Sequence, residues 1–303
     1  MSILVVGSVA MDSVKTPFGS VKNALGGSAT YFSVSASYFA PVNLVAVVGS
    51  DFPADYLDVL RKHDISLEGL QTVPGKTFRW KGQYTYDLNQ AETLDTQLNV
   101  FAHFSPKIPD AYRNSKYVFL GNIDPELQRE VLRQVKSPAL VACDTMNFWI
   151  ERKPHELKKT LKHVDILVIN EAEVRQLAEE SSLVKAARAI CSWGPKALVI
   201  KRGEYGVLFF NRHHVFSAPA YPLEAVFDPT GAGDTFAGGF MGYIAKSGKL
   251  DDGHLRRAIV FGSIMASFDV EDFSLNRLRA LNWKKITQRF AHFKKLTHFE
   301  MVK

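Results

Sequence analysis

The chain has 303 residues, of which 46% are hydrophobic and 22% are charged. This is the composition of a globular protein and excludes a disordered chain. Its only two cysteines, Cys143 and Cys191, lie in separate segments, which excludes a disulfide scaffold and indicates no zinc site. No stretch approaches the roughly 18 apolar residues of a membrane helix, and the N-terminus lacks the basic region of a signal peptide. The sequence therefore predicts one domain over residues 1–303 in the cytoplasm, with no membrane partner.

The net charge of +6 is concentrated at the C-terminal end of the sequence, where residues 277–303 hold eight Lys or Arg and one acid. Such a segment is either a tail for nucleic acid or an acidic surface, or the solvated face of a packed helix. Trp283, Ile286, Phe290 and Phe293 recur at helical spacing, which favours the packed helix. We therefore expect no nucleic-acid partner.

Short apolar runs rich in β-branched residues alternate with helix-length segments. The runs are residues 3–9, 44–49, 117–122, 139–145, 165–170 and 197–203, and the helical segments include 53–63, 126–135, 171–179 and 183–193. This alternation predicts a doubly wound, mainly parallel α/β sheet flanked by helices. Ligands of such sheets bind beyond the carboxyl ends of the strands. The polar residues ending four runs are candidates for lining that cleft, although each is equally a helix cap: Asn122, Asp144, Asn170 and Lys201.

Residues 76–104 break this rhythm. Phe78, Trp80, Tyr84 and Tyr86 alternate with polar residues, a pattern typical of antiparallel strands with one solvated face. The expected partner is the segment 12–23. We predict a small β-sheet, inserted within the domain, that covers a site as a lid or joins two copies of the chain. A homodimer is favoured, because a small sheet with an exposed apolar face is marginal alone.

The segment DPTGAGDTFAGGF, residues 228–240, carries the strongest chemical signal. Its glycines precede a predicted helix over 235–244, and such a turn directs several N–H groups and the helix dipole toward one point. Asp234 at the helix start is either an ordinary cap or a general base beside a phosphate-binding loop, and the flanking glycines favour the base. No Walker loop or GxGxxG dinucleotide fingerprint occurs in the chain, which argues against an NAD oxidoreductase.

This segment closely resembles the C-terminal signature of the ribokinase-like (PfkB) carbohydrate kinase family, which includes nucleoside kinases. Further resemblances follow in the family's order: GSVAMD at 7–12, the diglycine Gly26-Gly27, NEAE at 170–173, and the glycines of KRGEYG at 203 and 206. The family also places a β-lid near 76–100. The joint occurrence of these motifs implies a ribokinase-like fold with a lid and a kinase that uses ATP and Mg²⁺.

The resemblance implies a role for each matching residue. Asp234 accepts the proton of the attacking hydroxyl, while the N–H groups of Gly231, Ala232 and Gly233, with that of Asp234, stabilise the transferred phosphoryl group. Glu173, with Asn170, helps to hold Mg²⁺ through water. The residues expected at the nucleotide are Asn170, Glu173, Lys201, Gly203, Gly206 and Thr230.

The acceptor is expected at the other end of the cleft. The implied substrate residues are Asp12, Gly26, Gly27, Tyr31 and Asn122, with Asn147, Arg79 and Lys81 as further polar candidates. Tyr31 stands where the family often has a sugar-binding asparagine. Lys201 and Ser274 likewise replace a frequent small hydroxyl residue and a frequent glycine.

We therefore predict a kinase that phosphorylates a primary hydroxyl of a sugar or sugar-like substrate with MgATP. The alternative within the family is a nucleoside kinase of the adenosine type. From different classes, a nucleotide-binding regulatory protein and an NAD oxidoreductase are kept as less favoured alternatives, since intact Asp234 and its glycines argue against lost catalysis.

Overall fold

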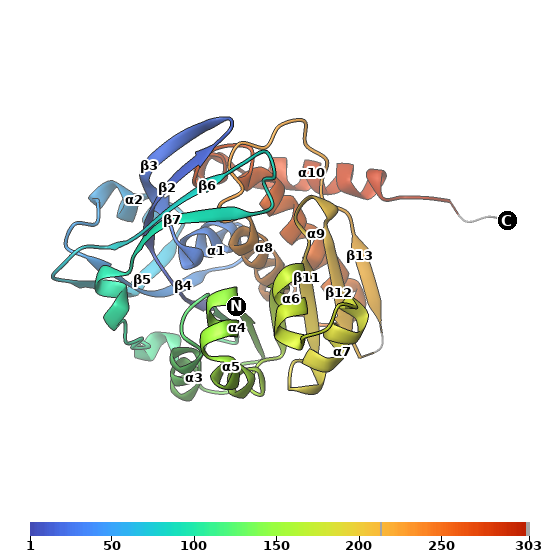
Figure 1. Ribbon diagram of the computed structural model, residues 1–303, viewed down its shortest axis with the longest axis horizontal. Helices are drawn as coiled ribbons and strands as arrows, with labels where there is room; N and C mark the ends of the chain where they lie inside the picture. Colours follow the sequence, from blue (N-terminus) through green and yellow to red (C-terminus); the bar gives the residue numbers. More distant parts are fainter. Residues whose placement is uncertain (213, 301–303) are drawn as a thin grey trace.

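A computed structural model describes residues 1–212 and 214–300, and within them two β-sheets organise the chain (Figure 1). The strands of the larger sheet are β1 Ile3–Val6, β4 Val42–Gly49, β5 Ile65–Val73, β8 Tyr117–Leu120, β9 Leu140–Asp144, β10 Ile166–Asn170, β11 Ala197–Lys201, β12 Val207–Asn211 and β13 Val215–Ala218. Their spatial order is β13-β12-β11-β10-β9-β8-β1-β4-β5. All neighbours pair in parallel except β11 with β12 and β12 with β13.

The strands are apolar on both sides because helices cover both faces of this sheet. In β1, Ile3 and Val5 pack into the core on one face, whereas Leu4 and Val6 pack into the core on the other. The helices of the first face are α1 Ser28–Ser37, α2 Ala54–Lys62, α8 Ala232–Ser247, α9 Asp252–Asp269 and α10 Trp283–Leu296. Those of the second are α3 Pro125–Gln134, α4 Asn147–Arg152, α5 Pro154–Leu161, α6 Glu171–Ala178 and α7 Leu183–Ser192. The predicted doubly wound, mainly parallel sheet is confirmed.

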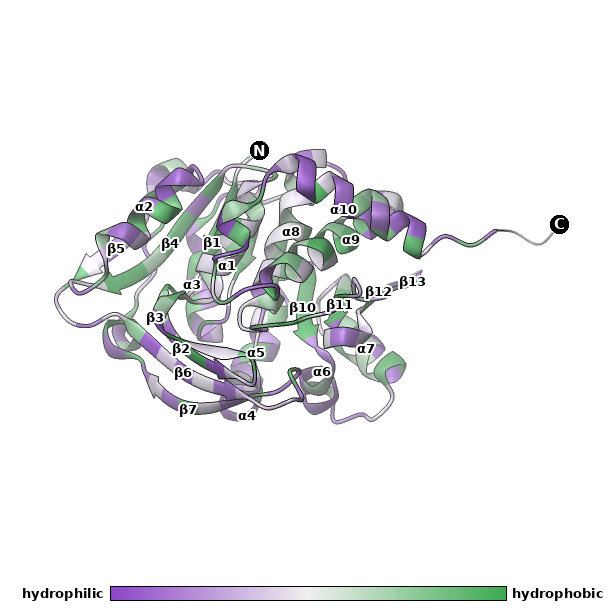
Figure 2. Cartoon of the chain, turned by 90° about the horizontal axis from the view of Figure 1, so that it is seen from above, coloured by the Kyte–Doolittle hydropathy of each residue, from purple (hydrophilic) through white to green (hydrophobic). Residues whose placement is uncertain are grey.

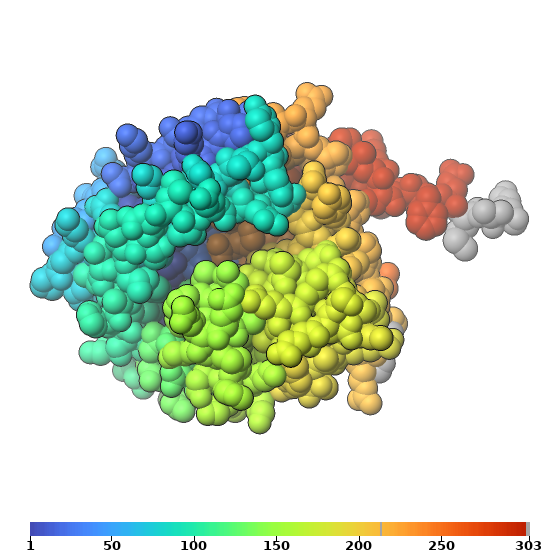
Figure 3. All heavy atoms as spheres, in the orientation of Figure 1, coloured from blue at the N-terminus to red at the C-terminus, as the bar shows by residue number. Residues whose placement is uncertain are grey.

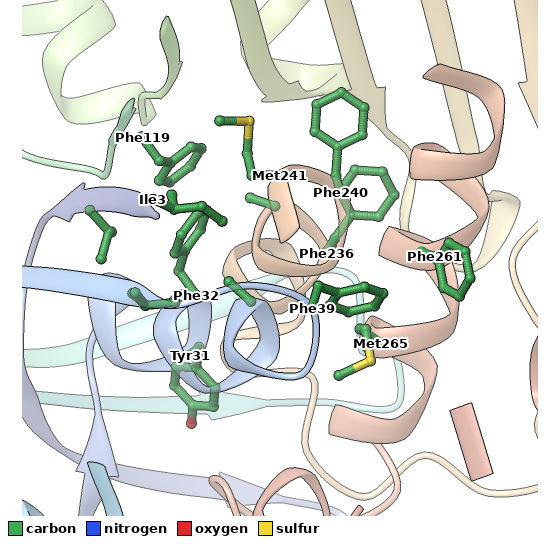
Figure 4. Packing of buried hydrophobic residues seen from close by; sticks show 14 of the residues in the cluster. Ile3, Tyr31, Phe32, Phe39, Phe119, Phe236, Phe240, Met241, Phe261 and Met265 are labelled. Carbon is green, nitrogen blue, oxygen red and sulfur yellow. The ribbon is translucent and has the colours of Figure 1, made fainter. Parts of the chain in front are cut away.

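Helix α8 lies in the first layer between α1 and α9 (Figure 4). Its glycines permit this close packing: a Cβ added at Gly238 would lie 2.4 Å from the carbonyl oxygen of Phe32, and one added at Gly239 would lie 2.9 Å from that of Phe261. On the sheet side, the ring of Phe32 stacks on Phe119 with centroids 4.3 Å apart. The start of α8, where the glycine-rich motif lies, is therefore held by helices on both sides.

The smaller sheet, which we call the lid, lies apart from the main sheet (Figure 2). It consists of β2 Ala10–Thr16, β3 Gly19–Gly26, β6 Phe78–Tyr84 and β7 Ala91–Gln97 in the order β3-β2-β6-β7. The hairpins β2–β3 and β6–β7 are antiparallel as predicted, but the pairing of β2 with β6 is parallel, so the prediction of a wholly antiparallel sheet is wrong there. The chain crosses α1, β4, α2 and β5 between the two hairpins, and such a crossover lets two strands run in the same direction.

The predicted aromatic face of the lid is divided among different neighbours. The ring of Phe78 stacks on Phe101 in the 3₁₀ helix η1, residues Asn99–His103, with centroids 5.3 Å apart. Tyr84 contacts Thr230 in the segment that precedes α8, as described below. Tyr86 is 87% exposed and contacts Phe18 edge to face. The three remaining 3₁₀ helices of the described chain are η2 Asp110–Tyr112, η3 Gly203–Tyr205 and η4 Leu278–Ala280.

The basic C-terminal segment forms the packed helix α10. Ile286 and Phe293 are buried, and Phe290 stacks on Phe261 of α9 with centroids 4.5 Å apart. The apolar stripe therefore packs against the domain and the lysines face outward. Over residues 1–212 and 214–300, no helix combines the length and apolar character needed to cross a membrane.

Candidate active site

Three neighbouring strands deliver polar side chains to one edge of the main sheet. Asp144 ends β9, Asn170 ends β10 and Lys201 ends β11. Asn170 lies directly beside Lys201 in the register of the parallel pair, and Asp144 lies beside Val168. The molecule is hollowed between the lid strands and the segment of α4 to α6 (Figure 3). The predicted cleft at the carboxyl ends of the strands is therefore formed by adjacent strands.

The start of α8 completes this edge. Gly231 is the N-cap with φ +82°, a left-handed conformation that glycine adopts without strain. A Cβ there would also lie 2.4 Å from the ring of Tyr31. The Ala232 N–H donates to Pro229 O at 3.2 Å, whereas Gly233 and Asp234 belong to the first helical turn, whose N–H groups have no preceding carbonyl to pair with. Those two N–H groups are the available donors for an anion.

Three carboxyl groups surround one ammonium in this cleft. Lys201 Nζ lies 3.7 Å from Asp144 Oδ2, and the Lys201 and Asp144 side chains are 19% and 8% exposed. Burial, together with the charge of Asp144, raises the pKa of Asp234 to about 7, although Lys201 opposes this. Burial opposes the charge of Lys201, but Asp144, Glu173 and Asp234 outweigh it and raise the lysine pKa. The excess of negative charge thus favours the protonated form of every group.

Asn170 and Glu173 form a capping box at the start of α6. The Glu173 N–H donates to Asn170 Oδ1 at 2.8 Å, and the Asn170 N–H donates to Glu173 Oε2 at 3.0 Å. Burial and the nearby Asp144 raise the pKa of Glu173 to about 7. The capping box occupies the Asn170 oxygen, but Glu173 Oε1 accepts no hydrogen bond from the described residues. Glu173 is therefore the better placed of the two for a water-mediated cation contact.

The lid strand β2 carries Asp12, which is 5% exposed and accepts a hydrogen bond from the Gly27 N–H at 3.3 Å. Burial and the charge of Asp228 raise its pKa to about 7. Gly26 and Gly27 both have to be small: a Cβ at Gly26 would lie 2.0 Å from Asp12 Oδ2, and Gly27 has φ +95° with the backbone of Ser8 close by. The diglycine thus makes room for the carboxylate.

Tyr31, one turn into α1, lies near Asp12 and against Gly231 at the start of α8. It is 1% exposed, and its ring covers Gly231. Burial and the charges of Asp12, Asp269 and Asp228 raise the pKa of its hydroxyl. Figure 4 shows the Tyr31 hydroxyl directed away from the packed rings of Phe32 and Phe39. Tyr31 therefore lies where the two halves of the predicted site meet.

The other predicted acceptor residues are engaged elsewhere. Asn122 donates to Met146 Sδ at 3.0 Å and accepts from Trp149 Nε1 at 2.9 Å, so α4 holds its amide. The Arg79 side chain forms an ion pair with Asp51 at 2.8 Å. Lys81 and Asn147 are exposed. No hydrogen bond or ion pair joins any of these side chains to Asp12 in the described part of the chain.

The lid also touches the loop of Gly203 and Gly206, which is predicted to border the nucleotide. At the turn between β6 and β7, Asn89 Nδ2 donates to Glu204 Oε1 at 3.3 Å, and the Glu204 N–H donates to Asn89 Oδ1 at 3.4 Å. Gly203 has φ +56°, and a Cβ there would lie 1.9 Å from Asn89 Oδ1, so a larger residue would require the Asn89 side chain to shift. A second bridge joins Thr230 Oγ1 to the Tyr84 hydroxyl at 3.3 Å. The lid thus spans the cleft and meets the proposed nucleotide side at two places.

Three aspartates of this region were given no specific role in the sequence-based prediction. Asp144 was expected only as one of four candidates for lining the cleft at the end of a strand. Asp228 accepts hydrogen bonds from the N–H groups of Thr230 at 2.9 Å and Ser274 at 3.2 Å, tying the glycine motif to the loop after α9. Asp269 is 1% exposed beside Thr235, with no hydrogen bond of normal geometry to its carboxyl oxygens among the described residues. Its place on an apolar helix offered no signal.

The profile of the pfkB family carbohydrate kinases matches residues 2–278. The chain belongs to this family. The match includes both sheets and every predicted site residue, and it ends before α10. Kinases of this PfkB family use ATP with Mg²⁺.

Individual relatives agree with this assignment. The chain is 30% identical to a cytidine kinase of Thermococcus kodakarensis over 259 residues, which cover 83% of this chain and 91% of that protein. The crystal structure of the Methanocaldococcus jannaschii nucleoside kinase superposes with a TM-score of 0.78 at 21% identity, covering 96% of this chain and 98% of that one. A putative ribokinase II of E. coli in complex with ATP and Mg²⁺ gives a TM-score of 0.79 at 16% identity, covering 96% and 99%. These likenesses support a ribokinase-like fold and a phosphotransferase.

Proposed function

We propose that this PfkB kinase transfers the γ-phosphoryl group of ATP to a primary hydroxyl of a nucleoside, with Asp234 as the general base. The observation that carries the proposal is the position of Asp234 in the first turn of α8, directly after Gly231 and beside the free N–H groups of that turn. A base must lie within reach of the hydroxyl whose proton it removes, and the phosphoryl acceptor site must lie next to it.

In this mechanism Asp12 accepts hydrogen bonds from a vicinal hydroxyl pair and orients the acceptor. Asp234 takes the proton of the primary hydroxyl as the oxygen of that hydroxyl attacks the γ-phosphorus. The bond between the γ-phosphorus and the β,γ-bridging oxygen breaks, and ADP leaves. The Gly233 and Asp234 N–H groups, aided by the dipole of α8, stabilise the charge on the transferred group. Gly203, Gly206 and Thr230 border the rest of the nucleotide, and Gly26 and Gly27 leave room for the acceptor hydroxyls.

The donor set of the cleft fits Mg²⁺. The ion prefers oxygen ligands and retains several waters, so it is held chiefly by nucleotide phosphates with few protein contacts. The carboxyl oxygen of Glu173 that the capping box leaves free is an oxygen donor of this kind. Bound Mg²⁺ would neutralise phosphate charge, and Glu173 would hold one of its waters.

A nucleoside is the preferred acceptor because the relative with 30% identity over most of its length is a cytidine kinase. Tyr31 is compatible with this choice, since it stands in place of the asparagine that often binds the sugar in this family. The second candidate is a free sugar, which the carbohydrate-kinase profile itself favours. Both acceptors use the same base and the same anion site.

The test is ATP-dependent phosphorylation of a panel of ribonucleosides, free sugars and polyols, with product identification by mass spectrometry. We expect the highest kcat/KM with a ribonucleoside. Asp12→Ala should raise the acceptor KM about 10- to 100-fold and leave the ATP KM nearly unchanged, because it leaves a hydroxyl pair without its partner. Tyr31→Asn should change the ranking of acceptors. Turnover of free sugars alone would refute the nucleoside proposal, and no turnover with any acceptor would refute the kinase.

A further inference from the structure

The ammonium of Lys201 occupies an electrostatically unusual position. A Cβ added at Gly233, in the first turn of α8, would lie 2.8 Å from Lys201 Nζ. The N-terminal end of a helix carries a positive partial charge, so a lysine there is normally disfavoured. The chain nevertheless directs a side chain that is only 19% exposed to this point. Two positive features that converge on one spot mark a place for an anion.

Asp144 explains how the lysine is kept there. Its carboxylate lies 3.7 Å from Lys201 Nζ and is 8% exposed. The Thr145 N–H donates to Asp144 Oδ1 at 2.7 Å, while Gln128 Nε2 donates to the Asp144 carbonyl at 3.1 Å. Both the side chain and the backbone of Asp144 are therefore anchored. At 3.7 Å the ammonium lies beyond normal hydrogen-bond distance, so it retains donors for another partner.

We infer that Lys201 is a catalytic residue that binds the γ-phosphoryl group directly during its transfer, and that Asp144 is the positioning residue that holds the ammonium over Gly233. This inference rests on the proposed phosphotransfer and deepens it, since it gives the lysine a specific phosphate rather than a general place at the nucleotide. In the proposed mechanism the γ-phosphate differs from the others because it is the one assigned to the N–H groups of Gly233 and Asp234.

The charges of the cleft support this assignment. Among the described residues, Lys201 is the one cation whose charge acts on Asp144, Glu173 and Asp234 alike, and three carboxylates would otherwise repel a triphosphate. A cation fixed between the carboxylates and the anion site reduces that repulsion at the point where the transferred group carries its charge. Removal of the ammonium should therefore weaken the binding of ATP more than the binding of ADP.

The experiment compares the dissociation constants of Mg²⁺-bound β,γ-imido-ATP and MgADP by calorimetry, together with kcat on the accepted substrate. Lys201→Met should raise the dissociation constant of the ATP analogue about 10- to 100-fold, which is the range for a lost hydrogen bond to a charged group. The dissociation constant of ADP should rise less than about threefold. Lys201→Arg should recover part of the difference, since it keeps the charge but changes its geometry. Asp144→Asn should reduce kcat and lower the ratio of ATP to ADP affinity.

Lys201→Met leaves three carboxyl groups without a cation, which can destabilise the fold. The double variant Lys201→Met/Asp144→Asn removes one charge of each sign and serves as the folded test. Lys196→Met is the matched control: Lys196 precedes the same strand at its opposite end, where it pairs with Asp165 at 2.7 Å and is 82% exposed. It should change neither affinity.

An unchanged ratio of ATP to ADP affinity in the folded double variant would overturn the role of Lys201. A lower ratio in Lys201→Met with an unchanged ratio and kcat in Asp144→Asn would overturn the positioning role of Asp144 alone. The proposed function fails by a different result, namely wild-type protein that binds neither nucleotide or phosphorylates no acceptor.

Discussion

Replacing Asp234 by asparagine should remove activity and at the same time stabilise the protein. The amide is nearly isosteric with the carboxyl group but cannot accept a proton. Loss of a general base lowers kcat about 10²- to 10⁴-fold. The same carboxylate is disfavoured by its surroundings, because burial and Asp144 raise its pKa to about 7. Function and stability thus oppose each other at this residue.

The size of the stabilisation follows from the pKa. A carboxyl pKa moved from 3.8 to about 7 corresponds to about 4 kcal/mol against the ionised form at high pH. Asp234 is partly exposed, so solvent screening reduces this to about 2 kcal/mol. For a chain of this size that free energy raises Tm by about 3 °C.

The difference in stability between Asp234→Asn and wild type should change with pH in a defined direction. Because the folded pKa lies above the unfolded value, the unfolded chain loses its proton first, and the native state loses relative stability from about pH 4 upward until it is itself ionised near pH 7. The advantage of Asp234→Asn should therefore be absent near about pH 4, grow as the pH rises, and level off above about pH 7.

The assay is chemical denaturation of wild type and variant across this pH range, with kcat measured on the accepted substrate. Asp55→Asn is the control, since Asp55 also lies in the first turn of a helix, α2, but is exposed. It should keep full activity and lose about 0.3–1 kcal/mol of stability through the helix dipole. A kcat of Asp234→Asn close to that of the wild type would refute the assignment of Asp234 as the general base. A stability difference that does not change with pH would refute the electrostatic reasoning.

Three further predictions concern the metal, the phosphate loop and the lid. Glu173→Gln should raise the Mg²⁺ concentration needed for half-maximal rate severalfold, and an unchanged metal titration would reduce Glu173 to a helix cap. Gly231→Ala should unfold or inactivate the protein, because the position has φ +82° and the new Cβ would lie 2.4 Å from the Tyr31 ring. The control Gly253→Ala should be tolerated, since no atom lies closer than 3.4 Å to its Cβ. Equal changes of Tm in the two variants would contradict this reasoning. The lid should join two copies of the chain through its outer strand Ala91–Gln97, because all residues of this edge strand are exposed. Sedimentation at high micromolar concentration should therefore give a mass of about twice 33.9 kDa. A monomer at that concentration would exclude the dimer.

Six of the nine strands of the main sheet were predictable because each is a short apolar run bounded by polar or turn residues, whereas β5, β12 and β13 lie outside the predicted runs. Strand β10, residues Ile166–Asn170, lies within its predicted run, and the same holds for the strand that ends at Lys201. Pairing in the lid was not predictable in this way. An alternating pattern defines which side chains share a face, but it is identical for parallel and antiparallel neighbours, so the parallel pairing of β2 with β6 required the path of the chain between them.

Residues within motifs were easier to predict than residues assembled across strands. Asp12 and Asp234 sit in contiguous segments that carry their own signal. The importance of Asp144 depends on β9, β10 and β11 being neighbours, which no local pattern states. Asp269 was hidden for another reason: α9 is apolar on nearly every side, and one carboxyl group among its buried residues does not disturb the helical pattern.

The packing of α8 explains how the protein tolerates a site with so many opposed charges. The first turn of the helix holds Asp234 against other carboxyl groups, and this repulsion would favour local opening of that turn. Farther along the helix, Gly238 and Gly239 allow α1 and α9 to approach within contact of the backbone, and the ring of Phe240 is fully buried. Burial of that surface stabilises the whole helix by far more than the few kcal/mol that the charges oppose. Close packing of the distant turns therefore permits an unfavourable first turn.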